Sequence, residues 1–214
     1  MHDFLESLSE NLEKMELLAR SKSAPVFFAR KGFEKNKFWV LIFVLLSSRT
    51  RDVVTSLAVK RLIEKYKDEN GLAKANERDV EKLIYGVGFY RVKARRIIKV
   101  AKQLKGRNFP SSFEELMELE GVGRKTANVV LNILFKKPVI GVDTHVHRIS
   151  NRLGIVKTSS PMETEEELMK IIPKKYRAKL NEVFVGYGQT ICFPKNPDCS
   201  TCVIRKYCNY FKNK

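Results

Sequence analysis

Apolar residues recur at helical spacing along most of the chain. Over residues 3–20 they follow a period near 3.6, at Phe4, Leu5, Leu8, Leu12, Met15 and Leu18. The same spacing predicts further helices over residues 36–47, 52–66, 77–84, 91–105, 112–118, 125–135, 144–152, 162–171 and 175–187. Asp52, Ser112 and Asp143 precede such segments and are predicted N-caps. Because no convincing alternating run of the strand type occurs, the pattern predicts an all-α fold.

The longest apolar run, FWVLIFVLL, covers only residues 38–46. A membrane span needs about twenty apolar residues, so this run predicts a buried core helix and no membrane association. The segment after Met1 is acidic and amphipathic, and it lacks the basic start and apolar stretch of a secretory signal. We therefore expect an intracellular protein, cytoplasmic or nucleoid-associated in a prokaryote.

The net charge of the chain indicates what kind of ligand it binds. The 214 residues include 41 Lys and Arg against 24 Asp and Glu, a formal net charge of +17. Such a surface attracts polyanions, and nucleic acid is the leading candidate. The alternative is a ribosome-associated or thermophilic protein with many solvated lysines. Crowded positive charge and the lack of an oligomerisation stripe predict a monomer.

Two Gly-Val-Gly turns form a weak internal repeat, because GVGFYRVKARRII (86–98) resembles GVGRKTANVVLNI (121–133). Glycine permits positive φ, and the N–H groups at a helix start point at a bound anion. The second turn therefore predicts a helix–hairpin–helix that contacts DNA phosphates without reading bases. The alternative is a plain helix connection. The candidate contacts are Gly121, Val122, Gly123, Arg124 and Thr126.

Lys125 lies where this turn meets the next predicted helix, and two roles are open to it. It can contact a phosphate, or its neutral amine can attack a sugar carbon and form a Schiff base. The second role also needs a negative charge near the cationic sugar, and Asp143 is the candidate. A helix over 126–135 rises about 15 Å, and residues 136–142 can span about 23 Å, so the chain can return beside it. The predicted role of Asp143 as an N-cap is compatible with this role.

The histidines that follow Asp143 are a poor metal pair. His145 and His147 lie two positions apart, so they point to different sides of a helix. We expect His145 to support the site beside Asp143, and His147 to face solvent or core.

The cysteines form the pattern C-x6-C-x2-C-x5-C within residues 192–208, at Cys192, Cys199, Cys202 and Cys208. Four thiolates can ligate a [4Fe-4S] cluster. Zinc ribbons usually carry two close C-x2-C pairs, whereas this chain has one. Disulfides are a further alternative in an oxidising compartment. The spacing favours the iron–sulfur cluster.

LEGVGRKTANVVLN, followed by VDTHVHRISNRLG and the cysteine pattern, resembles endonuclease III of the helix–hairpin–helix DNA glycosylase superfamily. The likeness extends from about residue 36 to residue 208. It implies a six-helix barrel lobe, residues 31–137, and a second helical lobe, residues 1–30 and 138–214, which carries the cluster.

The resemblance also implies the reaction. Lys125 would be the nucleophile and Asp143 the essential carboxylate of a bifunctional enzyme. This enzyme would remove oxidised pyrimidines from damaged double-stranded DNA, then cleave the strand at the abasic site by β-elimination, as an AP lyase. The alternatives are a mismatch or uracil/thymine glycosylase of the same superfamily and a non-catalytic hairpin protein that binds DNA. Lys125 favours the glycosylase with lyase activity.

Two residues depart from the family pattern. Arg49 stands where the family usually has a glutamine that fills the gap left by the flipped base. Arginine prefers guanine edges, which suggests lesions opposite purines. Phe89 stands where the family often has a leucine wedge, and an aromatic ring there can stack into the opened step. The alternative for Phe89 is a packed core side chain.

Overall fold

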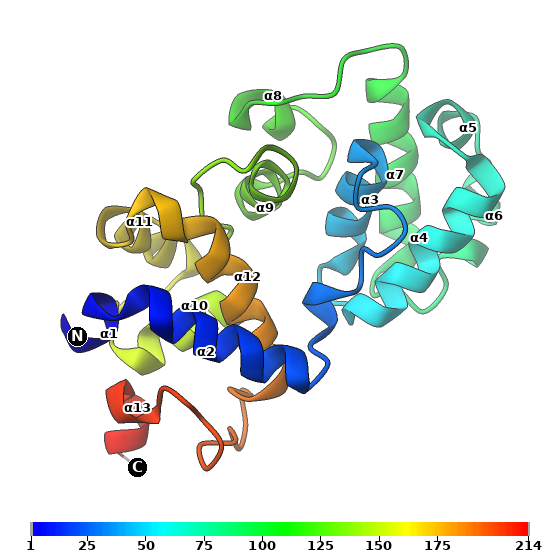
Figure 1. Cartoon of the computed structure of the whole chain (residues 1–214). Coiled ribbons are helices and arrows are strands. Elements are labelled where there is room, and N and C mark those ends of the chain that lie inside the picture. The colour runs from blue at the N-terminus through cyan, green and yellow to red at the C-terminus, as the bar shows by residue number, and fades with distance from the viewer. Residues whose placement is uncertain (1, 214) are drawn as a thin grey trace. The chain divides into compact units, whose positions relative to one another are not determined.

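The computed structural model describes residues 2–213 and divides into two compact units. One unit is Phe28–Phe135, and the other combines Met1–Phe27 with Lys136–Lys214. Every regular element within residues 2–213 is helical, which confirms the predicted all-α class (Figure 1). None of the helices in that range combines the length and apolar character that a membrane span requires.

The unit Phe28–Phe135 is built around the apolar run. The side chain of Asn36 accepts a hydrogen bond from Trp39 N–H at 3.1 Å and so begins α3. Residues 38–46 are all buried, as predicted, and α3 packs against α4, α7 and α9. The helices of this unit are α3 (Lys37–Ser47), α4 (Asp52–Tyr66), α5 (Glu69–Ala73), α6 (Glu77–Leu83), α7 (Tyr90–Leu104), α8 (Phe113–Met117) and α9 (Arg124–Phe135).

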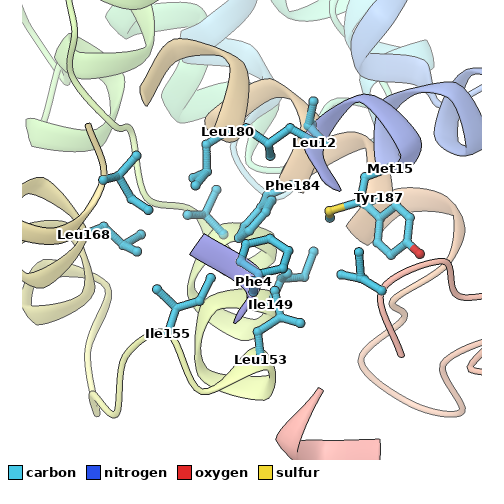
Figure 2. Close-up of a cluster of buried hydrophobic side chains, with 14 of the residues drawn as sticks. Phe4, Leu12, Met15, Ile149, Leu153, Ile155, Leu168, Leu180, Phe184 and Tyr187 are labelled. Carbon is cyan, nitrogen blue, oxygen red and sulfur yellow. The ribbon is translucent and has the colours of Figure 1, made fainter. Parts of the chain in front are cut away.

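The other unit has its own core between α2 and α12 (Figure 2). Met15 of α2 and Phe184 of α12 are fully buried there, beside Ile149 of α10. Each such side chain contributes about 1.5–3 kcal/mol through burial. The elements are α1 (His2–Glu6), α2 (Leu8–Ser21), η1 (Pro25–Phe27), α10 (Thr144–Leu153), α11 (Pro161–Ile171), α12 (Lys174–Thr190), η2 (Arg205–Tyr207) and α13 (Asn209–Lys212).

Two details of the predicted helices are wrong. The first predicted helix is interrupted at Ser7, which lies between α1 and α2 with φ −102° and ψ 30°. The N-cap of α4 is Arg51, and Asp52 is the first residue of the helix instead of its cap. An acidic side chain there still interacts favourably with the helix dipole, so aspartate suits both positions. Ser112 is the predicted cap of α8, and it forms a full capping box with Glu115.

Candidate functional site

The second Gly-Val-Gly turn joins α8 to α9 and has the backbone of a hairpin. Gly121 has φ +72°, and Val122 is buried and donates its N–H to Leu119 O at 3.0 Å. The first hydrogen bond of α9 runs from Ala127 N–H to Gly123 O at 2.9 Å. The amides in the first turn of α9 therefore point out of the helix end, where an anion can approach them.

The first Gly-Val-Gly turn, at residues 86–88, has the same arrangement, so the weak sequence repeat is also a structural repeat. Gly86 has φ +95°, Val87 is buried, and Val87 N–H donates to Ile84 O at 3.0 Å. The two turns differ in where the next helix begins. Phe89 stands between the first turn and α7 with φ +58°, whereas α9 begins directly after its turn.

The glycines of the second turn give a stability prediction. We expect Gly121→Ala to lower the free energy of unfolding by about 1–2 kcal/mol, because positive φ strains any residue with a Cβ. The added Cβ would also lie 2.7 Å from Arg96 Cδ. Gly123→Ala is the matched control, since its Cβ would meet nothing within 4 Å. Urea unfolding measures the stability of both variants. Equal losses of stability would contradict the requirement for glycine at position 121.

Lys125 is the second residue of α9, and its side chain is half-buried. Its neighbour Arg124 is exposed, with Cζ 5.3 Å from the centre of the Phe113 ring. Thr126 completes this first turn and is half-buried. The structure thus places Lys125 directly beside the outward-pointing amides of the hairpin.

Asp143 caps α10, which confirms the predicted N-cap. Its Oδ1 accepts hydrogen bonds from His145 N–H at 2.8 Å and from Val146 N–H at 2.9 Å. Oδ2 takes part in neither bond, and the side chain is half-buried. Lys125 belongs to the unit Phe28–Phe135 and Asp143 to the other unit. The approach of these two side chains therefore stays a prediction.

Arg148 connects α10 to the end of α12 and to the segment that follows it. Its Nη2 donates to Cys192 O at 2.7 Å and to Gly188 O at 3.2 Å. The same nitrogen lies 3.1 Å from Nδ1 of His145, whose ring packs against Gly188. Burial lowers the pKa of Arg148. His147 faces the protein, because its Nδ1 lies 2.7 Å from Oγ1 of the buried Thr164.

The four cysteines share one cavity and are free thiols, so the disulfide alternative is wrong for this structure. Arg152 Nη1 donates to Cys192 Sγ at 3.3 Å, and Tyr187 Oη donates to Cys202 Sγ at 3.2 Å. Burial raises the pKa of the Cys202 and Cys208 thiols. Among residues 2–213, no group of three or more His, Cys, Asp or Glu side chains is arranged to hold a metal ion. The donor set fits a thiolate-ligated group, with hydrogen-bond donors beside its sulfurs.

Phe89 and Arg49 lie together on the surface of their unit. Phe89 is 61% exposed, so the alternative of a packed core side chain is wrong. Arg49 has φ +53°, and its Cζ lies 5.5 Å from the centre of the Phe89 ring.

Sequence reasoning missed Lys93, the buried lysine of α7. It is 6% exposed, and its Nζ donates to Leu46 O at 2.8 Å and to Ser48 O at 2.5 Å. One signal was available, because Lys93 lies at helical spacing from the buried Ile97 and therefore on the apolar face of α7.

Comparison with known proteins gives the family. The HhH-GPD superfamily of base excision DNA repair proteins matches residues 42–174. Endonuclease III of Thermotoga maritima is 47% identical over 190 residues, which cover 87% of this chain and 89% of that protein. Endonuclease III of Rickettsia felis is 39% identical, over 84% of this chain and 85% of that protein. This chain belongs to the endonuclease III family.

Solved structures agree with this membership. A trapped covalent intermediate of endonuclease III with DNA, in an estranged-adenine complex, has a TM-score of 0.82 and 33% identity, and 97% of each chain is covered. A thermostable thymine-DNA glycosylase, 20% identical with a TM-score of 0.76, shares the fold, with 97% of this chain and 100% of that chain covered. As an endonuclease III family member, the chain is a base excision repair DNA glycosylase with AP lyase activity.

Proposed function

We propose that this endonuclease III family member removes oxidised pyrimidines from duplex DNA through a Schiff base on Lys125. The observation that carries the proposal is the position of Lys125 in the first turn of α9, directly after the hairpin. The similar endonuclease III trapped as a covalent intermediate with DNA supports it. A lysine that only contacts phosphate would form no covalent bond.

The chemistry follows from an amine and a carboxylate. The neutral Nζ of Lys125 attacks C1′ of the damaged nucleotide, and the bond from C1′ to the base breaks with its electron pair leaving on the base, which takes up a proton. The carboxylate of Asp143 stabilises the positive charge that develops on the sugar. Opening of the sugar ring leaves an iminium at C1′. Loss of a proton from C2′ then expels the 3′ phosphate, and water finally releases Lys125.

The DNA contacts in this proposal come from both turns. The amides of Gly123 and Arg124 and the side chain of Thr126 hold a phosphate, whereas the buried Val122 N–H is bonded to Leu119 O within the turn. Phe89 stacks into the step opened by base flipping. Arg49 contacts the partner base, with a preference for purines. His145, beside Asp143 at the start of α10, contacts the backbone near the reacting sugar. The exposure of Phe89 and the net charge of +17 support these roles.

We further propose that the two observed units are the two lobes of the family. The unit Phe28–Phe135 would form the barrel lobe and the other unit the lobe that carries the cluster. The active form would be a monomer that acts in a prokaryotic cell, in the cytoplasm or on the nucleoid, and the bacterial relatives support that setting.

The shared cavity supports a [4Fe-4S] cluster held by Cys192, Cys199, Cys202 and Cys208. A single zinc ion at 2.3 Å from each sulfur would draw all four to within about 4 Å of one another. The single C-x2-C pair in the spacing of the four cysteines favours the cluster over such a zinc site. When bound, the cluster holds the 192–208 loop and leaves the chemistry to the lysine and the carboxylate.

We expect the purified protein to be yellow-brown and to contain iron and acid-labile sulfide. Cys202→Ala should lose both, because one iron of the cubane loses its ligand. Lys195→Ala is the control, since Lys195 is an exposed residue of the same loop without a sulfur. Metal analysis and the visible absorption spectrum are the measurements. A colourless protein with bound zinc would contradict the cluster.

The proposed activity is tested with duplexes that each carry one defined lesion. Base loss and strand breakage are scored separately, by cleavage with and without alkali. We expect release of oxidised pyrimidines followed by β-elimination at the same site. Release of only uracil or mismatched thymine would favour the alternative glycosylase, and binding without any base loss would favour a non-catalytic protein.

A further inference from the structure

One buried amine joins the end of α3 and the residue after it to the first turn of α7. Lys93 Nζ donates to the carbonyl oxygens of Leu46 and Ser48, at the end of α3. The last carbonyls of a helix have no partner within it, so Lys93 closes this helix end. Burial lowers the pKa of Lys93 to about 8. Both the charged and the neutral amine have at least two N–H donors for these carbonyls.

A second hydrogen-bonded connection between these segments lies beside the first. Gly88 N–H donates to Thr50 Oγ1 at 3.0 Å, and Lys93 Nζ lies 3.3 Å from the same oxygen. A Cβ at position 88 would lie 2.6 Å from Arg49 O, so only glycine allows the two segments to approach this closely. Ser48, before Arg49, is therefore fixed to α7 by Lys93, and Thr50, after Arg49, is fixed to the turn before α7 by Gly88.

The two side chains presented by these segments both stand on strained backbone. Arg49 has φ +53° and Phe89 has φ +58°, and each such conformation costs about 1–2 kcal/mol for a residue other than glycine. Strain of this kind persists only where the surroundings hold it. The contacts of Lys93 and Gly88 provide that support directly beside both residues. The result is an exposed pair, with the Arg49 guanidinium over the Phe89 ring.

We propose that Lys93 is a positioning residue for lesion recognition, which fixes Arg49 and Phe89 as one probe without touching DNA itself. This inference rests on the proposed function, in which Phe89 enters the opened step and Arg49 contacts the partner base. Lys93 bonds the Ser48 carbonyl on one side of Arg49 and contacts the Thr50 hydroxyl on the other. It therefore sets how strongly the enzyme distinguishes the base opposite the lesion. A lysine that only stabilises the fold would change all substrates equally.

The experiment is a double-mutant cycle on opposite-base selectivity. Single-turnover rates of base release are measured for one oxidised pyrimidine opposite guanine and opposite adenine. The readout is the ratio of the rate opposite guanine to the rate opposite adenine. We expect Arg49→Ala to reduce this ratio at least about fivefold, the lower end expected for loss of a bidentate base contact. Lys93→Met should give a similar reduction. The double variant should lose no more selectivity than Arg49→Ala alone, since the two residues act through one contact.

Two further variants keep the test independent of folding defects. Gly88→Ala leaves Lys93 in place but puts a Cβ against Arg49 O, so it should reduce the ratio in the same way. Lys102→Met removes an exposed lysine from the same helix and should leave the ratio unchanged. An unchanged ratio in both Lys93→Met and Gly88→Ala overturns the inference. The inference is also overturned if the loss of selectivity from Lys93→Met adds fully to the loss from Arg49→Ala in the double variant.

Borohydride trapping on a preformed abasic site separates this inference from the proposed function. Lys93→Met should trap DNA through Lys125 as the unmodified protein does, because the probe acts before the covalent step. If trapping succeeds but Arg49→Ala has the ratio of the unmodified protein, the probe and this inference fail while the proposed function stands. If the unmodified protein traps no DNA, both fail.

Discussion

Lys125→Gln is expected to reduce strand cleavage at abasic sites at least about a thousandfold, the order of loss seen when a catalytic nucleophile is removed. Borohydride cross-linking to DNA should disappear altogether. Glutamine keeps a polar side chain in the first turn of α9 but has no amine that can form an imine. The hairpin amides are backbone groups and are unaffected, so binding to an undamaged duplex should fall only severalfold, as expected for one lost positive charge.

Arg124→Gln is the matched control for charge. It removes one positive charge from the same turn, next to Lys125, and leaves the amine in place. We expect weaker duplex binding, similar to that of Lys125→Gln, together with retained cross-linking. Gel shift, cleavage of an abasic duplex and borohydride trapping measure the three quantities on the same DNA. Cleavage by Lys125→Gln at the rate of the unmodified protein would refute the covalent mechanism.

The features that were predicted correctly from the sequence are set by local interactions. The apolar run at 38–46 has no polar position that could face water, so burial of all its residues in α3 follows from composition alone. The caps Ser112 and Asp143 bond amides two or three residues further on, so each cap depends on a few consecutive residues. The hairpin likewise needs only glycine where φ must be positive.

The missed features depend on residues far apart in the chain. Lys93 bonds carbonyls 45 and 47 positions away, and a lysine in a basic helix has no local property that predicts this. The short helix α5 contains Gly71, a weak helix former, and its N-cap Asp68 accepts the Gly71 N–H at 2.8 Å. The strained backbone of Arg49 was also not predictable, since Lys93 and Gly88 support it from another segment.

Asp143→Asn is expected to separate the two roles of this side chain. Asparagine caps helices as well as aspartate does, so its Oδ1 can still accept the His145 and Val146 N–H bonds. The free energy of unfolding should therefore change by less than about 0.5 kcal/mol, because the cap remains. The negative charge is lost, so base release should slow about 10²–10³-fold, the range for removal of one electrostatic contact to a transition state.

Asp143→Ala provides the contrast, because it removes both the cap and the charge. We expect it to lower the free energy of unfolding by about 1 kcal/mol and to slow base release as much as asparagine does. Urea unfolding and single-turnover base release on the same preparations measure the two effects separately. If the asparagine variant released the base at the unmodified rate while alanine did not, Asp143 would act only through the start of α10. Loss of release in both variants, with stability lost only in alanine, would instead mean that the charge of Asp143 acts on the reacting sugar while its oxygen holds the helix.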